Sequence, residues 1–191
     1  MKIASVLATA FAAFLAALAA LALPVHAAVT PPAKLIKDLE GVYQHRLATK
    51  IAVPGNSDKK VESDDVVEIA GHGENTAYVR ASLTVRDGHR CNITGVAAVE
   101  KGHLVYRDPD PDLSDKLLCM LTVSRKGDAL HLTDRATPKG PSTCSALCGA
   151  RSNLGDYTIP MSKKAKITYL PKLKASKQYQ MAVKAFNEAQ R

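Results

Sequence analysis

The chain has 191 residues, a formal net charge of +8 at pH 7, and only 5% aromatic residues with no tryptophan. This length suits one domain around a single hydrophobic core. The charge is uneven: residues 28–161 carry 17 basic and 17 acidic side chains, whereas residues 162–191 carry eight basic side chains against Glu188. The excess of positive charge therefore belongs to the C-terminal segment, and we expect no nucleic-acid-binding function for the domain before it.

The first 27 residues have the composition of an export signal. Lys2 precedes an apolar, alanine-rich run over residues 3–23, and Pro24 and Ala27 follow it. A single positive charge, an apolar stretch and a small residue at its end predict a secretory signal peptide, residues 1–27. An uncleaved membrane anchor is the alternative, but no basic cluster follows the run. We therefore expect a periplasmic or secreted protein without a transmembrane anchor after cleavage.

Residues 28–161 are expected to form the folded domain, and its first element is a short helix. In "PPAKLIKDLEG" two prolines stand at the start and Gly41 stands just past the end, which is the usual distribution of these residues around a helix. Beyond Gly41 the chain changes to strand-like patterns, so we expect no further helix before the basic C-terminal segment.

Strict alternation over residues 76–86, "TAYVRASLTVR", predicts a half-buried strand. Weaker alternation marks "LLCMLTVSR" and "CNITGVAAV", and the segments "VEKGHLVYRD" and "VSRKGDALHLTD" have the pattern of two hairpins. The sequence therefore predicts a mainly β fold: an antiparallel up-and-down meander of seven to eight strands, closed as a small barrel or packed as a sandwich. Closure removes exposed edges, which favours the barrel.

Residues 162–191 are expected to form a basic C-terminal segment with one amphipathic helix. In "KLKASKQYQMAVKAFNEAQR", Tyr179, Val183 and Phe186 share one helical face, and charged residues occupy the opposite face. The helix can pack on the β domain with its lysines in solvent, or it can dock on an anionic polymer or lipid. The lysines assigned to binding are Lys163, Lys164, Lys166, Lys174 and Lys177.

All four cysteines, Cys91, Cys119, Cys144 and Cys148, follow the signal peptide, and an even number in an exported chain favours disulfides. Four cysteines allow three pairings, which sequence cannot separate; we favour 91–119 with 144–148. A zinc site would need a second short Cys/His knuckle, and a redox site would need a C-x-x-C motif. We therefore expect structural disulfides, no metal and no cofactor.

The acidic stretch "RDPDPDLSD" places Asp108, Asp110 and Asp112 at alternate positions, as in a calcium loop. Leu113 stands where such a loop has glycine, and Cys119 stands where it has glutamate. We therefore expect a solvated acidic loop, which could meet a basic partner through charge complementarity.

Three residues near the best strand, Tyr78, Arg80 and Arg86, are assigned to a binding surface on its polar face, because Tyr and Arg are frequent at interfaces. Arg151 is also assigned to binding. No nucleophile motif, phosphate loop or paired carboxylates in an apolar context occur, so no catalytic residue is predicted.

The segments "GVYQHRL", "CNITGVAAV", "LVYRD", "CMLTV" and "TCSALCGAR" together resemble a group of small exported proteobacterial proteins with a C-x3-C-G-x-R segment, some of them lysozyme-inhibitor-like. The resemblance implies a non-enzymatic binding protein of the cell envelope, with a lysozyme or an anionic envelope polymer as partner. The Ser-Gly-plus-Tyr loop of C-type lysozyme inhibitors is absent, which argues against that inhibitor class.

Two other functions stay open. The "G-x-Y" at residues 41–43 resembles the "G-x-W" start of lipocalin-like barrels, which implies a carrier with a small ligand in its barrel interior. The last alternative is a hydrolase whose site carries no recognisable motif.

Overall fold

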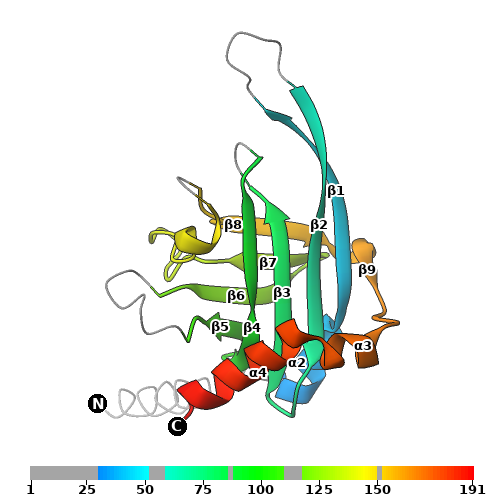
Figure 1. Cartoon of the computed structure of the whole chain (residues 1–191), viewed down its shortest axis with the longest axis vertical. Helices are drawn as coiled ribbons and strands as arrows, with labels where there is room; N and C mark the ends of the chain where they lie inside the picture. The colour runs from blue at the N-terminus through cyan, green and yellow to red at the C-terminus, as the bar shows by residue number, and fades with distance from the viewer. Residues whose placement is uncertain (1–29, 52–58, 86–87, 110–117, 150–151) are drawn as a thin grey trace, which may run out of the picture.

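A computed structural model describes residues 30–51, 59–85, 88–109, 118–149 and 152–191. Within these ranges the chain forms one antiparallel sheet of nine strands with the order β8-β7-β6-β5-β4-β3-β2-β1-β9, curled into a nearly closed barrel (Figure 1). The strands are β1 (Gly41–Ile51), β2 (Lys59–Gly71), β3 (Thr76–Thr84), β4 (Arg90–Glu100), β5 (His103–Arg107), β6 (Met120–Lys126), β7 (Ala129–Thr133), β8 (Asp156–Pro160) and β9 (Lys164–Ala165). The predicted mainly β meander is confirmed.

Consecutive strands are neighbours from β1 to β8, and both predicted hairpins are present as β4–β5 and β6–β7. The number of strands is nine and not seven or eight. The additional pairing of β9 with β1 spans two residues, too few to display any periodicity in the sequence.

The core fills the inside of the barrel because alternate residues of each strand point inward. On β3 these are the residues that the alternation assigned to the apolar face: Ala77, Val79, Ala81 and Leu83 are all buried. The inner cluster continues through β4 to β8 with large side chains that are fully buried, namely Leu104, Leu121, Leu130, Leu132 and Ile159. The described interior is therefore a packed core.

The helix α2 (Pro32–Leu39) closes one end of the barrel, and the predicted N-terminal helix is thus confirmed. Leu35, Ile36 and Leu39 are buried in the inner cluster. The hydroxyl of Tyr43 donates a hydrogen bond to the carbonyl of Leu39 at 2.8 Å, which ties the helix to β1. At the opposite end the β1–β2 hairpin extends beyond the other strands (Figure 1).

The buried carboxylate of Asp65 connects β2 to β8, the strand at one edge of the sheet. This β2 residue is fully buried and accepts hydrogen bonds from the backbone N–H of Thr84 and from the hydroxyl of Tyr157 on β8. Burial and the neighbouring carboxylate raise the pKa of the Tyr157 hydroxyl. The interaction joins residues 92 positions apart, so it links the first strands of the meander to the last one.

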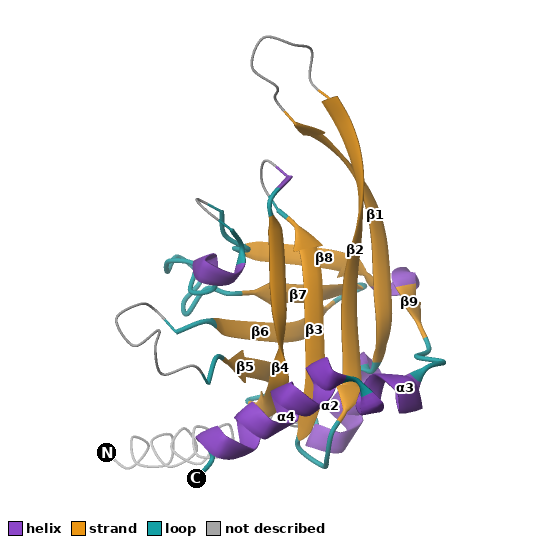
Figure 2. Ribbon diagram, viewed as in Figure 1, coloured by secondary structure: helices purple, strands orange, loops and turns teal. Residues whose placement is uncertain are grey.

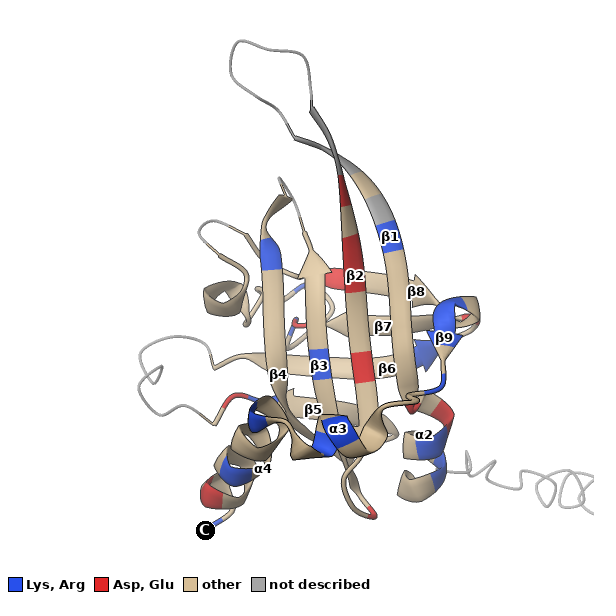
Figure 3. Cartoon of the chain, turned by 45° about the vertical axis from the view of Figure 1, so that its right-hand side comes forward, with Lys and Arg blue, Asp and Glu red and all other residues tan. Residues whose placement is uncertain are grey.

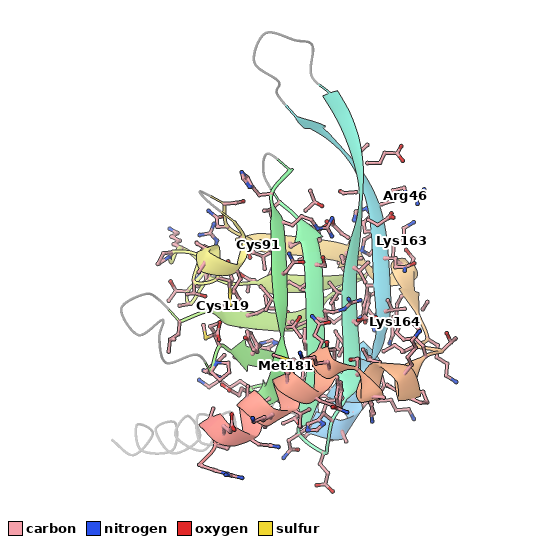
Figure 4. The ribbon with its side chains drawn as sticks, viewed as in Figure 1. Arg46, Cys91, Cys119, Lys163, Lys164 and Met181 are labelled. Carbon is pink, nitrogen blue, oxygen red and sulfur yellow. A yellow bond between two sulfur atoms is a disulfide. The ribbon has the colours of Figure 1, made fainter. Side chains whose placement is uncertain are left out.

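The cysteines form two disulfides, Cys91–Cys148 and Cys119–Cys144, and none is free. Structural disulfides are therefore confirmed, but the favoured pairing was wrong. Strand β5 separates β4, which contains Cys91, from β6, which Cys119 precedes. Two strand spacings amount to about 9.5 Å, beyond the reach of a disulfide. Cys144 and Cys148 flank the 3-10 helix η4 (Ser145–Leu147). Cys148 bonds to Cys91 of β4, and Cys144 bonds to Cys119 just before β6; Figure 4 labels Cys91 and Cys119.

The C-terminal segment lies across the outer face of the barrel (Figure 2). One helix was expected, but the structure has two, α3 (Leu170–Ala175) and α4 (Lys177–Ala189). Ser176 separates them with an extended backbone, and its hydroxyl accepts a hydrogen bond from the N–H of Tyr179. A serine side chain that caps a following helix competes with helix continuation at that position, which explains the break.

The C-terminal helices complete a second apolar cluster outside the barrel. Its buried members are Val42, Ala70, Tyr78, Ile167, Leu173 and Tyr179. The first three lie on the outer face of β1, β2 and β3, and the last three come from the segment that covers them. The sheet is therefore apolar on both faces in this region, with the barrel core on one side and the C-terminal segment on the other.

Candidate functional site

Four of the residues assigned to binding, Arg86, Asp110, Asp112 and Arg151, lie outside the described residues. Asp108 is described: it follows β5, is half-buried, and its N–H donates a hydrogen bond to the carbonyl of Cys119 at 2.8 Å. The acidic loop as a binding element therefore stays a prediction.

Tyr78 and Arg80 do not form an exposed surface, contrary to their assignment. Tyr78 is fully buried, and its ring packs on that of Tyr179 with 4.9 Å between ring centroids. Burial raises the pKa of the Tyr78 hydroxyl to about 12. The polar face of β3 was interpreted as a solvent face because alternation distinguishes two faces and cannot tell whether another segment covers the second one.

Arg80 belongs to a polar cluster beneath the C-terminal segment. Its Nε lies 2.5 Å from Oε2 of Glu68, whose side chain is buried, while the Arg80 side chain is 36% exposed. The hydroxyl of Tyr169 donates to the other carboxylate oxygen of Glu68. Burial and this carboxylate raise the pKa of Tyr169 to about 12. The cluster fixes the start of α3 to the barrel and has both carboxylate oxygens occupied, so it is structural.

The lysine-rich segment, residues 163–177, runs along β9 and α3, where Figure 3 colours its lysines blue. Its six lysines are Lys163, Lys164, Lys166, Lys172, Lys174 and Lys177, and all except the half-buried Lys164 are exposed. Lys164 donates a hydrogen bond to the carbonyl of Asp38 at 2.7 Å. In the part of the chain that the structure describes, none of the six forms an ion pair.

Two further hydrogen bonds hold the segment in place at the start of α4. The side-chain amide of Gln178 donates to Thr94 of β4 at 3.1 Å. Nδ1 of His72 lies 2.8 Å from the hydroxyl of Tyr179. Burial, reinforced by the charge of Lys174, lowers the pKa of His72. The lysines thus lie on a backbone anchored at several points. The packing of α4 on the barrel is the first of the two arrangements expected for this helix.

A groove of about 780 Å³ lies between α4 and the outer faces of β4 and β5. Its centre is apolar, formed by Val96 and Ala98 of β4, Val105 of β5, and Ala185 and Phe186 of α4. Met181 of α4 also lines it and is 59% exposed (Figure 4). A concave, mostly apolar surface of this volume is typical of small-molecule sites.

Polar side chains also line the groove, among them Thr94 of β4, Asp108 after β5 and Gln190 after α4. Lys177 and Gln178 line it at the start of α4. Glu100 and Arg107 line it where β4 and β5 meet, and they form an ion pair with each other, with Nη2 of Arg107 2.9 Å from Oε2 of Glu100. Because Arg107 is already paired, Lys177 is the lining cation without an ion-pair partner among the described residues.

Sequence reasoning missed the groove, although β4 contained a signal. The segment Val96–Val99 is continuously apolar, "VAAV", and does not alternate. A run of this kind indicates a strand covered on both faces. The weaker alternation found over this strand predicts only one covered face, whereas Val96 and Ala98 on the other face line the groove.

No cluster of His, Cys, Asp or Glu side chains that could hold a metal ion occurs within the described ranges. Over the same ranges, no helix has both the length and the apolar character needed to span a membrane. What the described residues place at the C-terminal segment is a row of exposed lysines and a mostly apolar groove.

Comparison of the chain with protein-family models, with curated proteins and with solved structures finds no match.

Proposed function

We propose that the protein is a non-enzymatic, exported binding protein that attaches to an anionic polymer of the cell envelope through its lysine-rich segment. Two disulfides support an oxidising compartment, where such bonds persist. The proposal agrees with the expected signal peptide and with the net positive charge of residues 162–191, which follow a domain whose basic and acidic side chains cancel.

The observation that carries the proposal is the exposure of lysines that no acidic side chain of the described residues neutralises. Lys163, Lys166, Lys172 and Lys174 are exposed and lack ion pairs within the described residues. Charges held on an anchored segment attract an anionic surface without first having to be ordered, so less conformational entropy is lost on binding. The attraction must weaken as salt increases, because exposed charges are screened.

A matched pair of triple variants tests the proposal. One replaces Lys166, Lys172 and Lys174 with glutamine, and the other replaces three exposed lysines outside the segment, Lys101, Lys126 and Lys139. Both variants have the same net charge. Point substitutions are preferable to deletion of residues 162–191, because deletion would uncover the apolar outer face of β1–β3.

Retention on immobilised dextran sulfate, with neutral dextran as the control matrix, gives the readout. Each lysine near an anionic surface contributes about 1 kcal/mol at low salt. The segment variant should therefore bind roughly 100-fold more weakly, while the variant outside the segment binds like the parent. Equal losses in the two variants would show that net charge alone acts, and the proposal would be wrong.

Lysozyme inhibition stays a prediction of the sequence resemblance. It depends on the acidic loop with Asp110 and Asp112, which lies outside the described residues. Clearing of cell-wall suspensions by lysozymes of the C, G and I types, with the purified protein added, measures it directly. Stoichiometric inhibition of one type would add a protein partner to the polymer proposed above.

A further inference from the structure

We propose that the groove between α4 and β4–β5 binds a long-chain carboxylate, such as a fatty acid, with its hydrocarbon chain along the groove and its head at Lys177. The groove shares Lys177 with the lysine-rich segment, but its lining does not include Lys166, Lys172 or Lys174, the lysines substituted in the test of polymer binding, so the two proposals can fail independently.

The shape of the groove suits one hydrocarbon chain. Its volume of about 780 Å³ falls in the range of small-ligand sites, roughly 300–1,000 Å³. The helix α4 that forms one wall has 13 residues, so at 1.5 Å per residue it offers a wall about 20 Å long. An apolar wall of this length favours an extended chain over a compact ring system.

The first residues of α4 hold the helix against the barrel, and its later residues form one wall of the groove. Tyr179 is buried against Tyr78, and Gln178 is bonded to Thr94. Farther along, Met181 is 59% exposed, and Ala185 and Phe186 are half-buried. These side chains face Val96 and Val105 across the groove. The apolar surface is thus held open by contacts at one end of the helix.

The charges at the two ends orient the ligand. At the far end Arg107 is neutralised by Glu100. At the start of α4, Lys177 lines the groove and is exposed, without an ion pair in the described part of the chain. An anionic head group therefore has its complementary charge beside Lys177, and the hydrocarbon extends toward Phe186. Met181, which lines the groove, can adapt to hydrocarbon chains of different length, because its side chain is unbranched and polarizable.

The packed barrel core supports an external site. Leu104, Leu121 and Leu132 are fully buried inside the barrel and contribute to its filling. The carrier alternative in the sequence analysis placed the ligand in that interior. In the present proposal the ligand binds instead on the outer wall of the barrel, where no core side chain has to be displaced for binding.

Titration of the purified, oxidised protein with cis-parinaric acid, a fluorescent fatty acid, tests the site. Ala185→Phe fills the groove with a ring, and Gln180→Phe places the same ring on an exposed position that does not line the groove. The first variant should bind at least roughly tenfold more weakly, since exclusion of two methylene groups already has that effect. The second should bind like the parent, and both should keep the parent's circular dichroism spectrum.

Lys177→Gln tests the orientation of the ligand. It should weaken binding of the carboxylate roughly two- to fivefold, as expected for an exposed ion pair, and leave binding of the matching methyl ester unchanged. Equal binding by the parent and the Ala185→Phe variant would overturn the proposal and place any ligand elsewhere. So would a concentration-dependent dimer that Met181→Gln abolishes, because a second copy would then cover the groove.

Discussion

Gly95 of β4 is the position where a single methyl group should cost most. A Cβ atom built there would lie 2.0 Å from Cε2 and 2.5 Å from Cδ2 of the Tyr106 ring, well inside van der Waals contact. Tyr106 is only 5% exposed and belongs to the inner cluster. The glycine is needed for the ring and not for the backbone, because its φ lies outside the positive range that favours glycine.

Gly95→Ala should lower the free energy of unfolding by about 3 kcal/mol. A partial shift of the ring costs about 1–3 kcal/mol, and its loss from the core costs about 3–5 kcal/mol. The corresponding fall in Tm is roughly 6–12 °C for a protein of this size. Urea unfolding of the oxidised protein, followed by far-ultraviolet circular dichroism, measures the change as a lower midpoint with an unchanged slope.

The same substitution in a Tyr106→Ala background separates the steric cause from a backbone cause. Without the ring, Gly95→Ala should be neutral or should stabilise by about 0.5 kcal/mol, through the entropy of the unfolded chain. Gly102→Ala is the control: its φ is +79° and nothing lies within 4 Å of an added Cβ, so its cost of about 1–2 kcal/mol should be equal in both backgrounds. If Gly95→Ala costs the same in both backgrounds, the steric argument is refuted.

Three other outcomes are expected. Arg80→Leu should destabilise the protein by about 3 kcal/mol in urea unfolding, because it leaves the buried carboxylate of Glu68 without its cation. A Glu68→Gln/Arg80→Leu double variant should recover part of this loss of stability, and no recovery would contradict the reasoning. The contribution of His72 to the free energy of unfolding should be fully present above about pH 6.5, the ordinary pKa of histidine, and should decrease as the pH falls below it. The reason is that burial lowers the pKa of His72, so the unfolded chain takes up the proton first. His72→Gln should reduce the dependence of stability on pH, and an unchanged dependence would assign it to other groups. Peptide mapping without reduction should recover the two disulfides given above, and peptides joined as 91–119 would show that the barrel pairs its strands differently.

The inner half of the fold could be predicted from sequence, whereas the outer layer could not. Period-two alternation located β3 and correctly assigned Val79 and Leu83 to the core. The same alternation says nothing about a segment that arrives from more than 80 residues away to cover the second face. Tyr78 was the available signal, since a large aromatic ring on a nominally polar face is better buried than solvated.

The disulfide pairing failed for a related reason. Cys91 and Cys119 both have the pattern of core positions, and both are buried. Their separation depends on strand order in space, and an intervening strand of five residues, β5, keeps them apart. Local patterns specify which way a side chain points, but not which side chain it will meet.

The C-terminal segment also sets an order of events during synthesis of the chain. Ile167, Leu173 and Tyr179 follow all eight strands of the meander along the chain, yet they cover the outer face of the first three. Until these residues are synthesised, Val42, Ala70 and Tyr78 remain exposed to solvent as an apolar surface of the incomplete barrel, which is prone to aggregation. A chaperone that recognises apolar strands can therefore distinguish an incomplete chain from a finished one, because docking of this segment removes the surface that the chaperone would hold.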